Sequence, residues 1–417
     1  MRKWIFTILP VSFGFWLMSV ERAEAVSQWA RLIKQPCSTC HTPLFARLNY
    51  YGERYLRNGY QDPDAAEPDG DEAGKRAIGD MLRLGSVEFW LGARLNLTPI
   101  MVEPNAVTVN GEKKTRVSVG NANWLQLFVA GSIFKNMSIY IENEFEKDRF
   151  HFAWFYLGFQ NLGKSTLLNF QVGRLTPVEF TSYPDRLPQL PALGEGVMRV
   201  KSAGGKGEKA LDMRGGRFGI QYYGYKGPVV LYAGVSPGDI FPNVSQFLDY
   251  WGGVRLEIPE TTARGWKDWI GSSVTLHFYR GTDSKNTPTA QVKDDYIRVI
   301  PSLNLRFRDK IDIQGAYVYA KDDNWTLTVP ARELKFRGVR GVASYYINDH
   351  WALSVHYDRY TAEPKELLPE FHRLVFPVIT YKPRDNWRIS LYPEIDLRDV
   401  PSDSKQHKFY LNIRTMF

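Results

Sequence analysis

The sequence predicts an all-β transmembrane barrel of about 16 antiparallel strands, preceded by a small, mostly helical segment that we expect to plug the lumen. Three observations support this fold class. The chain begins with an export signal, and apolar and polar residues alternate along segments spread from Ser86 onward. The last of these segments ends on Phe417, and a terminal aromatic residue on an amphipathic strand is typical of bacterial outer-membrane proteins. A soluble sandwich also shows alternation, but its polar faces point outward.

The first residues have the three parts of a secretory signal. Arg2 and Lys3 form a basic start, Trp4 to Val20 is an apolar run, and Ala23 to Ala25 fits the small-x-small cleavage rule. A retained anchor helix is the alternative, but the apolar run is short and contains a proline. We therefore predict a signal peptide over residues 1–25 and export of the mature chain.

Charge and hydropathy argue against a nucleic-acid partner and against a membrane-spanning helix after the signal. The formal charge of +8 is spread along the chain rather than clustered, so it predicts no nucleic-acid partner. No stretch after the signal is apolar over a length that would cross a bilayer as a helix.

One pentapeptide carries most of the chemical information. Cys37-Ser38-Thr39-Cys40-His41 has the spacing of a c-type haem attachment site, and the chain has no other cysteine. Each thiol can add to a vinyl group of the porphyrin, and His41 can then ligate the iron as the proximal ligand. A thioredoxin-type redox pair is the alternative, but it requires a βαβ context and leaves His41 without a role. The motif therefore predicts one covalent haem c, held by Cys37, Cys40 and His41.

The haem motif lies in a short segment that we assign to residues 26–85. Helical spacing of apolar residues, followed by a stop at Asn58-Gly59, predicts one helix packed against the porphyrin or against a small core; the residues are Leu44, Leu48, Tyr51 and Tyr55. We predict that this segment enters the barrel ahead of the first strand and plugs it. A barrel of about 16 strands otherwise encloses an aqueous channel.

The sixth ligand of the iron is less well determined. Met81 is the only methionine in the 26–85 segment, and methionine is a known axial ligand of c-type haem. Met101 is the next candidate. A methionine is also common apolar filler, and a ligand from the barrel or an open position stays possible.

The barrel, residues 86–417, is predicted from alternation with a period of two. The expected strands are Ser86–Thr98, Trp124–Ser132, Met137–Glu146, His151–Gln160, Leu168–Arg174, Gly216–Tyr225, Val229–Ser236, Asp249–Ile258, Ser272–Arg280, Tyr296–Phe307, Ile311–Lys321, Glu333–Ile347, Trp351–Tyr360, Arg373–Lys382, Trp387–Arg398 and Lys408–Phe417. Most connections after even-numbered strands are short, whereas the opposite set includes Pro99–Asn123 and Thr176–Gly215. Because outer-membrane barrels have short periplasmic turns and longer external loops, we expect both termini in the periplasm.

Charged residues are predicted on the inward faces of several strands. Six arginines have this position and offer bidentate geometry to haem propionates: Arg94, Arg255, Arg298, Arg306, Arg388 and Arg414. Glu142, Glu144 and Glu146 share one strand face and can attract a hard cation. A polar, solvated lumen wall is the preferred interpretation of most of these arginines and of the three glutamates.

The combination resembles a known family. A cleaved signal, a single-haem segment and a porin-like barrel in one chain resemble the fused outer-membrane cytochrome–porins, which include the iron-oxidising outer-membrane cytochromes. The resemblance is most specific in Trp29-Ala30-Arg31, the pentapeptide at 37–41 and the run from Leu48-Asn49 through Gly52 to Asn58-Gly59-Tyr60. Trp29 departs from the phenylalanine expected there.

The resemblance implies an oxidoreductase-like activity at the bacterial outer membrane. Extracellular Fe(II) would give electrons to the haem, and a periplasmic c-type cytochrome would accept them. Two alternatives stay open. One is an electron conduit for a different extracellular donor or acceptor, and the other is a diffusion porin whose haem segment is only structural.

Overall fold

The fold is described from a computed structural model of the chain. Its described residues are 35–43, 47–64, 76–78, 82–84, 90–109, 112–120, 123–134, 136–146, 149–184, 190, 196–200, 211–213, 215–238, 247–286 and 291–416. The predicted signal peptide at 1–25, Trp29 to Arg31 and Phe417 lie outside these residues. In the described part of the chain, no helix is long and apolar enough to cross a membrane.

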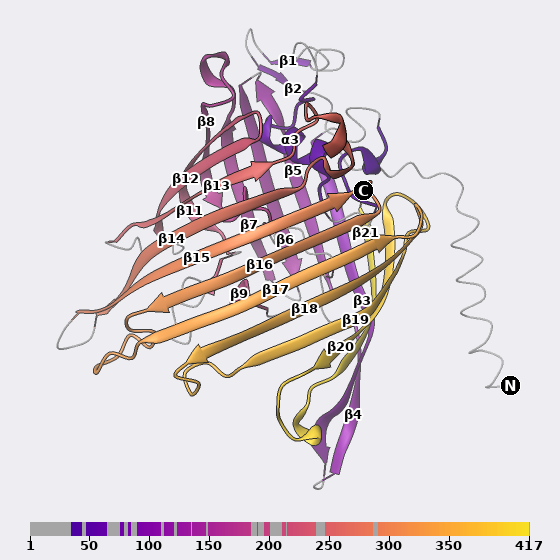
Figure 1. The fold of residues 1–417 in the computed structure, drawn as a ribbon, viewed down its shortest axis with the longest axis vertical. Helices are drawn as coiled ribbons and strands as arrows, with labels where there is room; N and C mark the ends of the chain where they lie inside the picture. Colours follow the sequence, from indigo (N-terminus) through magenta and orange to yellow (C-terminus); the bar gives the residue numbers. More distant parts are fainter. Residues whose placement is uncertain are drawn as a thin grey trace, which may run out of the picture.

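A closed antiparallel barrel forms most of the molecule (Figure 1). Sixteen strands make the circuit: β3 (Leu91–Val109), β5 (Trp124–Phe134), β6 (Met137–Glu146), β7 (Arg149–Phe159), β8 (Asn169–Leu175), β11 (Arg217–Lys226), β12 (Val229–Gly238), β13 (Asp249–Glu257), β14 (Ser273–Asn286), β15 (Gln291–Phe307), β16 (Ile311–Asp322), β17 (Leu334–Tyr346), β18 (Trp351–Glu363), β19 (Phe371–Tyr381), β20 (Trp387–Asp396) and β21 (Lys408–Met416). The circuit closes where β21 pairs with β3. The predicted fold class is therefore confirmed, and every predicted strand overlaps one of these.

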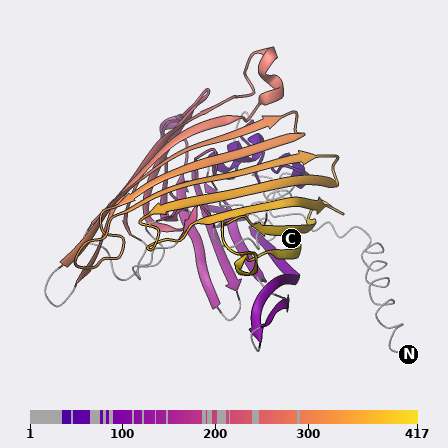
Figure 2. The ribbon, with the colours of Figure 1, turned by 60° about the horizontal axis from the view of Figure 1, so that its bottom comes forward.

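The first predicted loop is partly a strand. We expected a loop over Pro99–Asn123, but β3 continues to Val109 and pairs with an added strand, β4 (Glu112–Val119). This hairpin extends beyond the rest of the barrel (Figure 2). The residues of β4 are exposed on both faces except Ser118, which is only partly buried. A strand without a buried face has no alternation for a sequence to display.

The barrel has a polar interior and an apolar outer face, as β15 shows. Buried and exposed residues alternate along it from Gln291 to Asn304. The residues facing inward include Arg298 and Asn304, whereas Ile297 is 40% exposed on the outer face. An apolar outer face with a polar interior is the arrangement that a lipid-embedded barrel requires.

Short turns gather at one rim of the barrel. Arg308 and Asp309, between β15 and β16, have φ values of 49° and 51°, which is the left-handed conformation of a tight hairpin turn. Strand direction alternates around the circuit, so β15 and β21 both end at this rim. The end of β21 pairs with the start of β3, which places Leu91 and Met416 at the same rim. We call it the short-turn rim.

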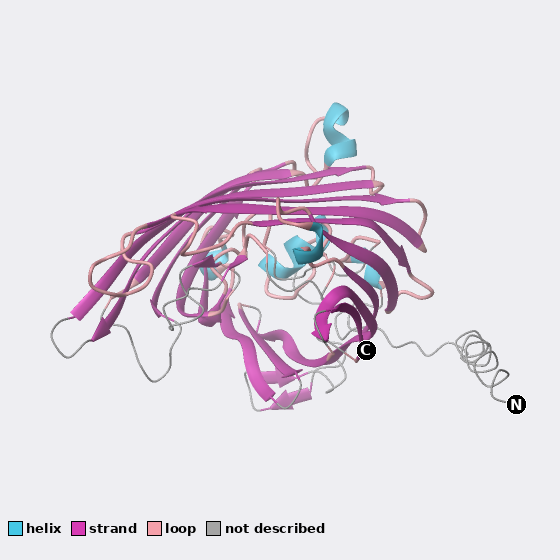
Figure 3. Ribbon diagram, turned by 90° about the horizontal axis from the view of Figure 1, so that it is seen from below, coloured by secondary structure: helices cyan, strands magenta, loops and turns pink. Residues whose placement is uncertain are grey.

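Two segments fill the interior. The helix α3 (Tyr50–Arg57) lies inside the ring of strands near the short-turn rim (Figure 3). The second segment is the Thr176–Gly215 connection, which we predicted as an external loop. Its described residues instead pack against the inner wall, with Val178 and Phe180 at 0% and 3% exposure. The connection starts at the rim opposite the short turns, as predicted, but its inward fold was not predicted; its apolar side chains find their burial inside the barrel.

Four short strands lie outside the circuit in the described part of the chain. The two-residue strands β9 (Arg199–Val200) and β10 (Leu211–Asp212) pair within the interior connection. Upstream of the barrel, β1 (Arg76–Ile78) pairs with β2 (Leu82–Leu84).

Candidate functional site

The candidate site is built on one tight turn. The 3-10 helix η1 (Cys37–Thr39) is followed by Cys40, and the carbonyl oxygen of Cys37 accepts from the N–H groups of Cys40 and His41 at 3.2 and 2.9 Å. This turn places two thiols and an imidazole on five consecutive residues. Both thiols are free of a disulfide, and Cys37 is buried.

Residues 47–49 run antiparallel to residues 40–42 and form backbone hydrogen bonds with them. His41 and Leu48 form an isolated antiparallel bridge, and the N–H of Asn49 donates to the carbonyl of Cys40 at 2.9 Å. The Asn49 side chain forms hydrogen bonds with both the turn and the helix. Its amide donates to the carbonyl of Thr39 at 2.9 Å, and its Oδ1 accepts from Gly52 N–H as the N-cap of α3.

The helix α3 packs directly on the turn. A Cβ added at Gly52 would lie 2.0 Å from the carbonyl oxygen of Cys40, so only glycine permits this approach. The helix ends at Arg57, with Asn58 as its C-cap and Gly59 at φ +69°, which is the stop that the sequence predicted. The helix and the turn therefore form one compact unit. Leu44, part of the predicted helical pattern, lies outside the described residues.

Burial sets the protonation of this unit. It lowers the pKa of His41 to about 4, and the charge of nearby Arg94 acts in the same direction. The imidazole is therefore neutral at pH 7, which is the form that ligates iron. Burial also raises the pKa of the Cys40 thiol to about 12, so Cys40 stays a thiol rather than a thiolate.

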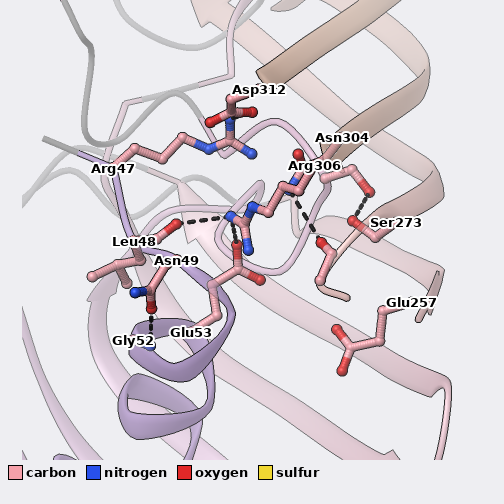
Figure 4. A network of polar contacts seen from close by, with 12 residues as sticks. Arg47, Leu48, Asn49, Gly52, Glu53, Glu257, Ser273, Asn304, Arg306 and Asp312 are labelled. Carbon is pink, nitrogen blue, oxygen red and sulfur yellow. Dashed lines mark hydrogen bonds and ion pairs between the residues drawn. The ribbon is translucent and has the colours of Figure 1, made fainter. Parts of the chain in front are cut away.

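Ion pairs fix the unit to the barrel wall (Figure 4). Glu53 of α3 lies between two inward-facing arginines: its Oε1 is 2.8 Å from Arg306 of β15, and its Oε2 pairs with Arg255 of β13. Burial opposes ionisation of Glu53, but the charges of Arg255 and Arg306 outweigh it and lower its pKa to about 2. Glu53 is therefore charged at neutral pH.

Two further ion pairs attach the segment to the barrel near the short-turn rim. Arg57 and Glu257 lie 3.0 Å apart with side chains only 5% and 3% exposed. Arg47 pairs with Asp312 of β16. Partners on β13, β15 and β16 thus hold the segment from one side.

Aromatic and amide contacts hold it from the opposite side. The hydroxyls of Tyr60 and Tyr156 are 2.6 Å apart, and the ring of Tyr60 stacks on Tyr140 of β6. The Gln61 amide donates to Ser132 Oγ at 3.0 Å. Residues 47–61 therefore span the barrel interior between strands on opposite walls.

The structure places the other predicted residues as follows. All six predicted arginines are buried, with exposures between 0% and 6%, which confirms their inward positions. Two of them, Arg255 and Arg306, bind the N-terminal segment. Met81 lies outside the described residues. Met101 packs among Tyr392 and Tyr410 in a cluster separate from the one that contains Tyr55 of α3.

The predicted glutamates are occupied by donors of the protein. Glu142 accepts from Tyr140 at 2.6 Å and from Gln126 at 2.7 Å. Glu144 lies 3.2 Å from Nε2 of His151. The side chain of Glu146 lies outside the described part. Among the residues that the structure describes, no group of three or more His, Cys, Asp and Glu side chains could hold a metal ion.

Sequence reasoning placed Arg255 and Arg306 on the inner wall but missed the other residues that attach the segment, Glu53, Arg57 and Glu257. Glu53 and Arg57 are one helical turn apart, and Arg255 and Glu257 are two residues apart on one strand. These spacings place each pair of opposite charges on a single face. The complementarity was present in the sequence, but nothing in it showed that these two faces meet.

Comparisons with known proteins identify the fold. No family model and no curated protein matches the sequence. Solved structures do match. The anion-selective porin from Comamonas acidovorans is 12% identical, with a TM-score of 0.55 over 78% of this chain and 99% of that chain.

Two other channels are comparable. The outer-membrane channel DcaP of Acinetobacter baumannii gives a TM-score of 0.52 at 11% identity, over 79% of this chain and 96% of that one. OmpF of Salmonella typhi, in complex with daunomycin, gives 0.50 at 11% identity, over 78% and 97%. This chain therefore has the fold of an outer-membrane porin.

Proposed function

We propose that this chain is an outer-membrane cytochrome that oxidises extracellular Fe(II) and passes the electrons to periplasmic c-type cytochromes. The observation that carries the proposal is the turn at Cys37 to His41, attached inside a porin-like barrel by the pairs of Glu53 and Arg57. A redox centre in this position is enclosed by a wall that has no strand edge open to lipid.

The residues of the turn fit a c-type haem. Two thiols that are not joined in a disulfide and a neutral imidazole are the donor set of such a site. Cys37 and Cys40 would hold the porphyrin covalently and His41 would ligate the iron, with Met81 as our candidate for the sixth position. The bound haem would supply one-electron chemistry, and the chain supplies the attachment and the surroundings that set its potential.

The orientation follows from the rims. In outer-membrane barrels the short turns face the periplasm, and the candidate site lies near the short-turn rim, where β3 begins and β21 ends. We therefore place both termini and the site on the periplasmic side, within reach of a soluble cytochrome. Fe(II) would give its electron to the haem from the lumen on the long-loop side, so that insoluble Fe(III) forms on that side of residues 47–61 and not in the periplasm.

Rapid mixing of the purified protein with Fe(II) tests the proposal. We expect the absorption spectrum to change from ferric to ferrous haem. A haem that stays ferric with Fe(II), yet is reduced by another donor, would support an electron conduit for that donor instead.

A diffusion porin with a structural haem segment is the second candidate. It is favoured by the fold, because every solved structure compared above is a porin or an outer-membrane channel. Conductance in planar bilayers separates the two. A porin conducts ions steadily, whereas a barrel closed by residues 47–61 should conduct little.

A further inference from the structure

Arg306 of β15 contacts the loop behind the candidate site as well as the helix. Its Nη2 atom donates to the carbonyl oxygen of Leu48 and to Oε1 of Glu53, each at 2.8 Å. Its own backbone N–H donates to Ser272 Oγ at 2.9 Å, and the residue is 5% exposed. One buried guanidinium therefore joins the barrel wall to residues 48 and 53 (Figure 4).

Leu48 is in turn bound to the residues of the motif. It forms the isolated bridge with His41. On either side of that bridge, Thr42 N–H donates to the carbonyl of Arg47 and Asn49 N–H donates to the carbonyl of Cys40, both at 2.9 Å. Residues 40–42 are therefore hydrogen-bonded on both sides of His41 to residues 47–49.

The neighbouring connection on the same wall leaves room for this guanidinium at one glycine. Gly271, between β13 and β14, has φ +80°, and a Cβ added there would lie 2.8 Å from Arg306 Nη1 and 2.7 Å from Cβ of Tyr50. A larger residue would push the arginine away from Leu48. Both the backbone conformation and the space thus depend on glycine.

We propose that Arg306 is a positioning residue for His41, so that the barrel wall sets the orientation of the imidazole. This inference rests on the proposed function, because it concerns the histidine as an iron ligand. Residues that orient a ligating histidine tune both the metal's affinity and its potential. Here the orienting group comes from a barrel strand 265 residues further along the chain.

The test compares three variants of the full chain. Arg306→Gln removes the charge and the fork, and Gly271→Ala crowds the same guanidinium while leaving Arg306 in place. Arg308→Gln is the control, since Arg308 lies two residues away, has a side chain that is 63% exposed and pairs at the surface with Asp268. Amide hydrogen exchange of residues 40–49 and the haem midpoint potential are measured in each.

We expect hydrogen exchange of residues 40–49 to accelerate about tenfold in Arg306→Gln, the effect of losing a hydrogen bond to a charged group. Gly271→Ala should act in the same direction, and both should shift the midpoint potential. Arg308→Gln should change neither. Unaltered exchange and potential in Arg306→Gln and Gly271→Ala would overturn the inference, even with haem present. Wild-type protein without covalent haem would instead overturn the proposed function.

Discussion

Both terminal nitrogens of Arg57 lie 3.0 Å from Oε1 of Glu257, which joins the N-terminal helix to a barrel strand 200 residues away. Both side chains are nearly inaccessible to solvent. A carboxylate in such a place is stable only with its partner. This buried pair therefore holds α3 against β13 on the inner wall of the barrel.

Arg57→Met should loosen α3 strongly. Removal of Arg57 takes away the bidentate partner of the buried Glu257 and leaves the longer 3.3 Å contact with Nε of Arg255, so the cost should approach the about 3–5 kcal/mol of a broken buried pair. Hydrogen exchange of the α3 amides reports this opening free energy. The matched control is Arg54→Met, because Arg54 pairs with the exposed Glu260 and Asp64 and such surface pairs contribute less than about 1 kcal/mol. Equal effects of the two variants would argue against a buried attachment.

Deletion of residues 26–85 should raise the ionic conductance of the barrel in planar bilayers. Residues 47–61 reach from β13, β15 and β16 across to β5, β6 and β7, so their loss opens the short-turn rim. The far-ultraviolet spectrum of the deleted protein checks that the barrel still forms. A full-length chain that conducts as well as the deleted one would show that the segment does not obstruct the lumen.

The attachment of α3 should weaken in acid through Glu53. The pKa of Glu53 is about 2 in the folded chain, below its ordinary value of 4.5. The stabilisation is therefore fully present above pH 4.5 and is lost as the pH falls from 4.5 toward 2. Pepsin, which works in this range, should cut residues 47–64 faster as the pH falls. Glu53→Gln should be cut at a rate that varies much less with pH.

An arginine on the outer face should destabilise the barrel. Phe278 of β14 is 50% exposed on the apolar outer surface, and arginine in a lipid-facing position near the midplane costs about 2–4 kcal/mol. Phe278→Arg should lower the urea midpoint of protein reconstituted in vesicles. Val329→Arg is the comparison, since Val329 lies between β16 and β17, is 79% exposed and should change stability by less than about 0.5 kcal/mol. The reverse order would place the lipid on the wrong surface.

Most of the barrel strands were predictable because the alternation of neighbouring residues shows on which face each one lies. Along β15 each residue shows on which face it lies, through alternation of Ile297 with Arg298 and of Leu303 with Asn304. The tight turn at Arg308 and Asp309 is also encoded by neighbouring residues. The cysteine–histidine turn was found in the same way, since its chemistry occupies five consecutive positions.

The remaining features depend on contacts between distant residues. Nothing near Glu53 specifies Arg255 or Arg306, and nothing near Ser182 specifies its contact with Thr275 on the inner wall. Such pairs form only after the barrel has closed around them. This is why the inward fold of the connection after β8 was not predicted.

The mass of the intact purified protein tests the central claim most directly. We predict the mature chain, without residues 1–25, carrying the added mass of one haem. The Cys37→Ser/Cys40→Ser variant should show the same chain without that addition. A wild-type protein with the mass of the unmodified polypeptide, isolated from cells that attach haem to other c-type cytochromes, would contradict the account.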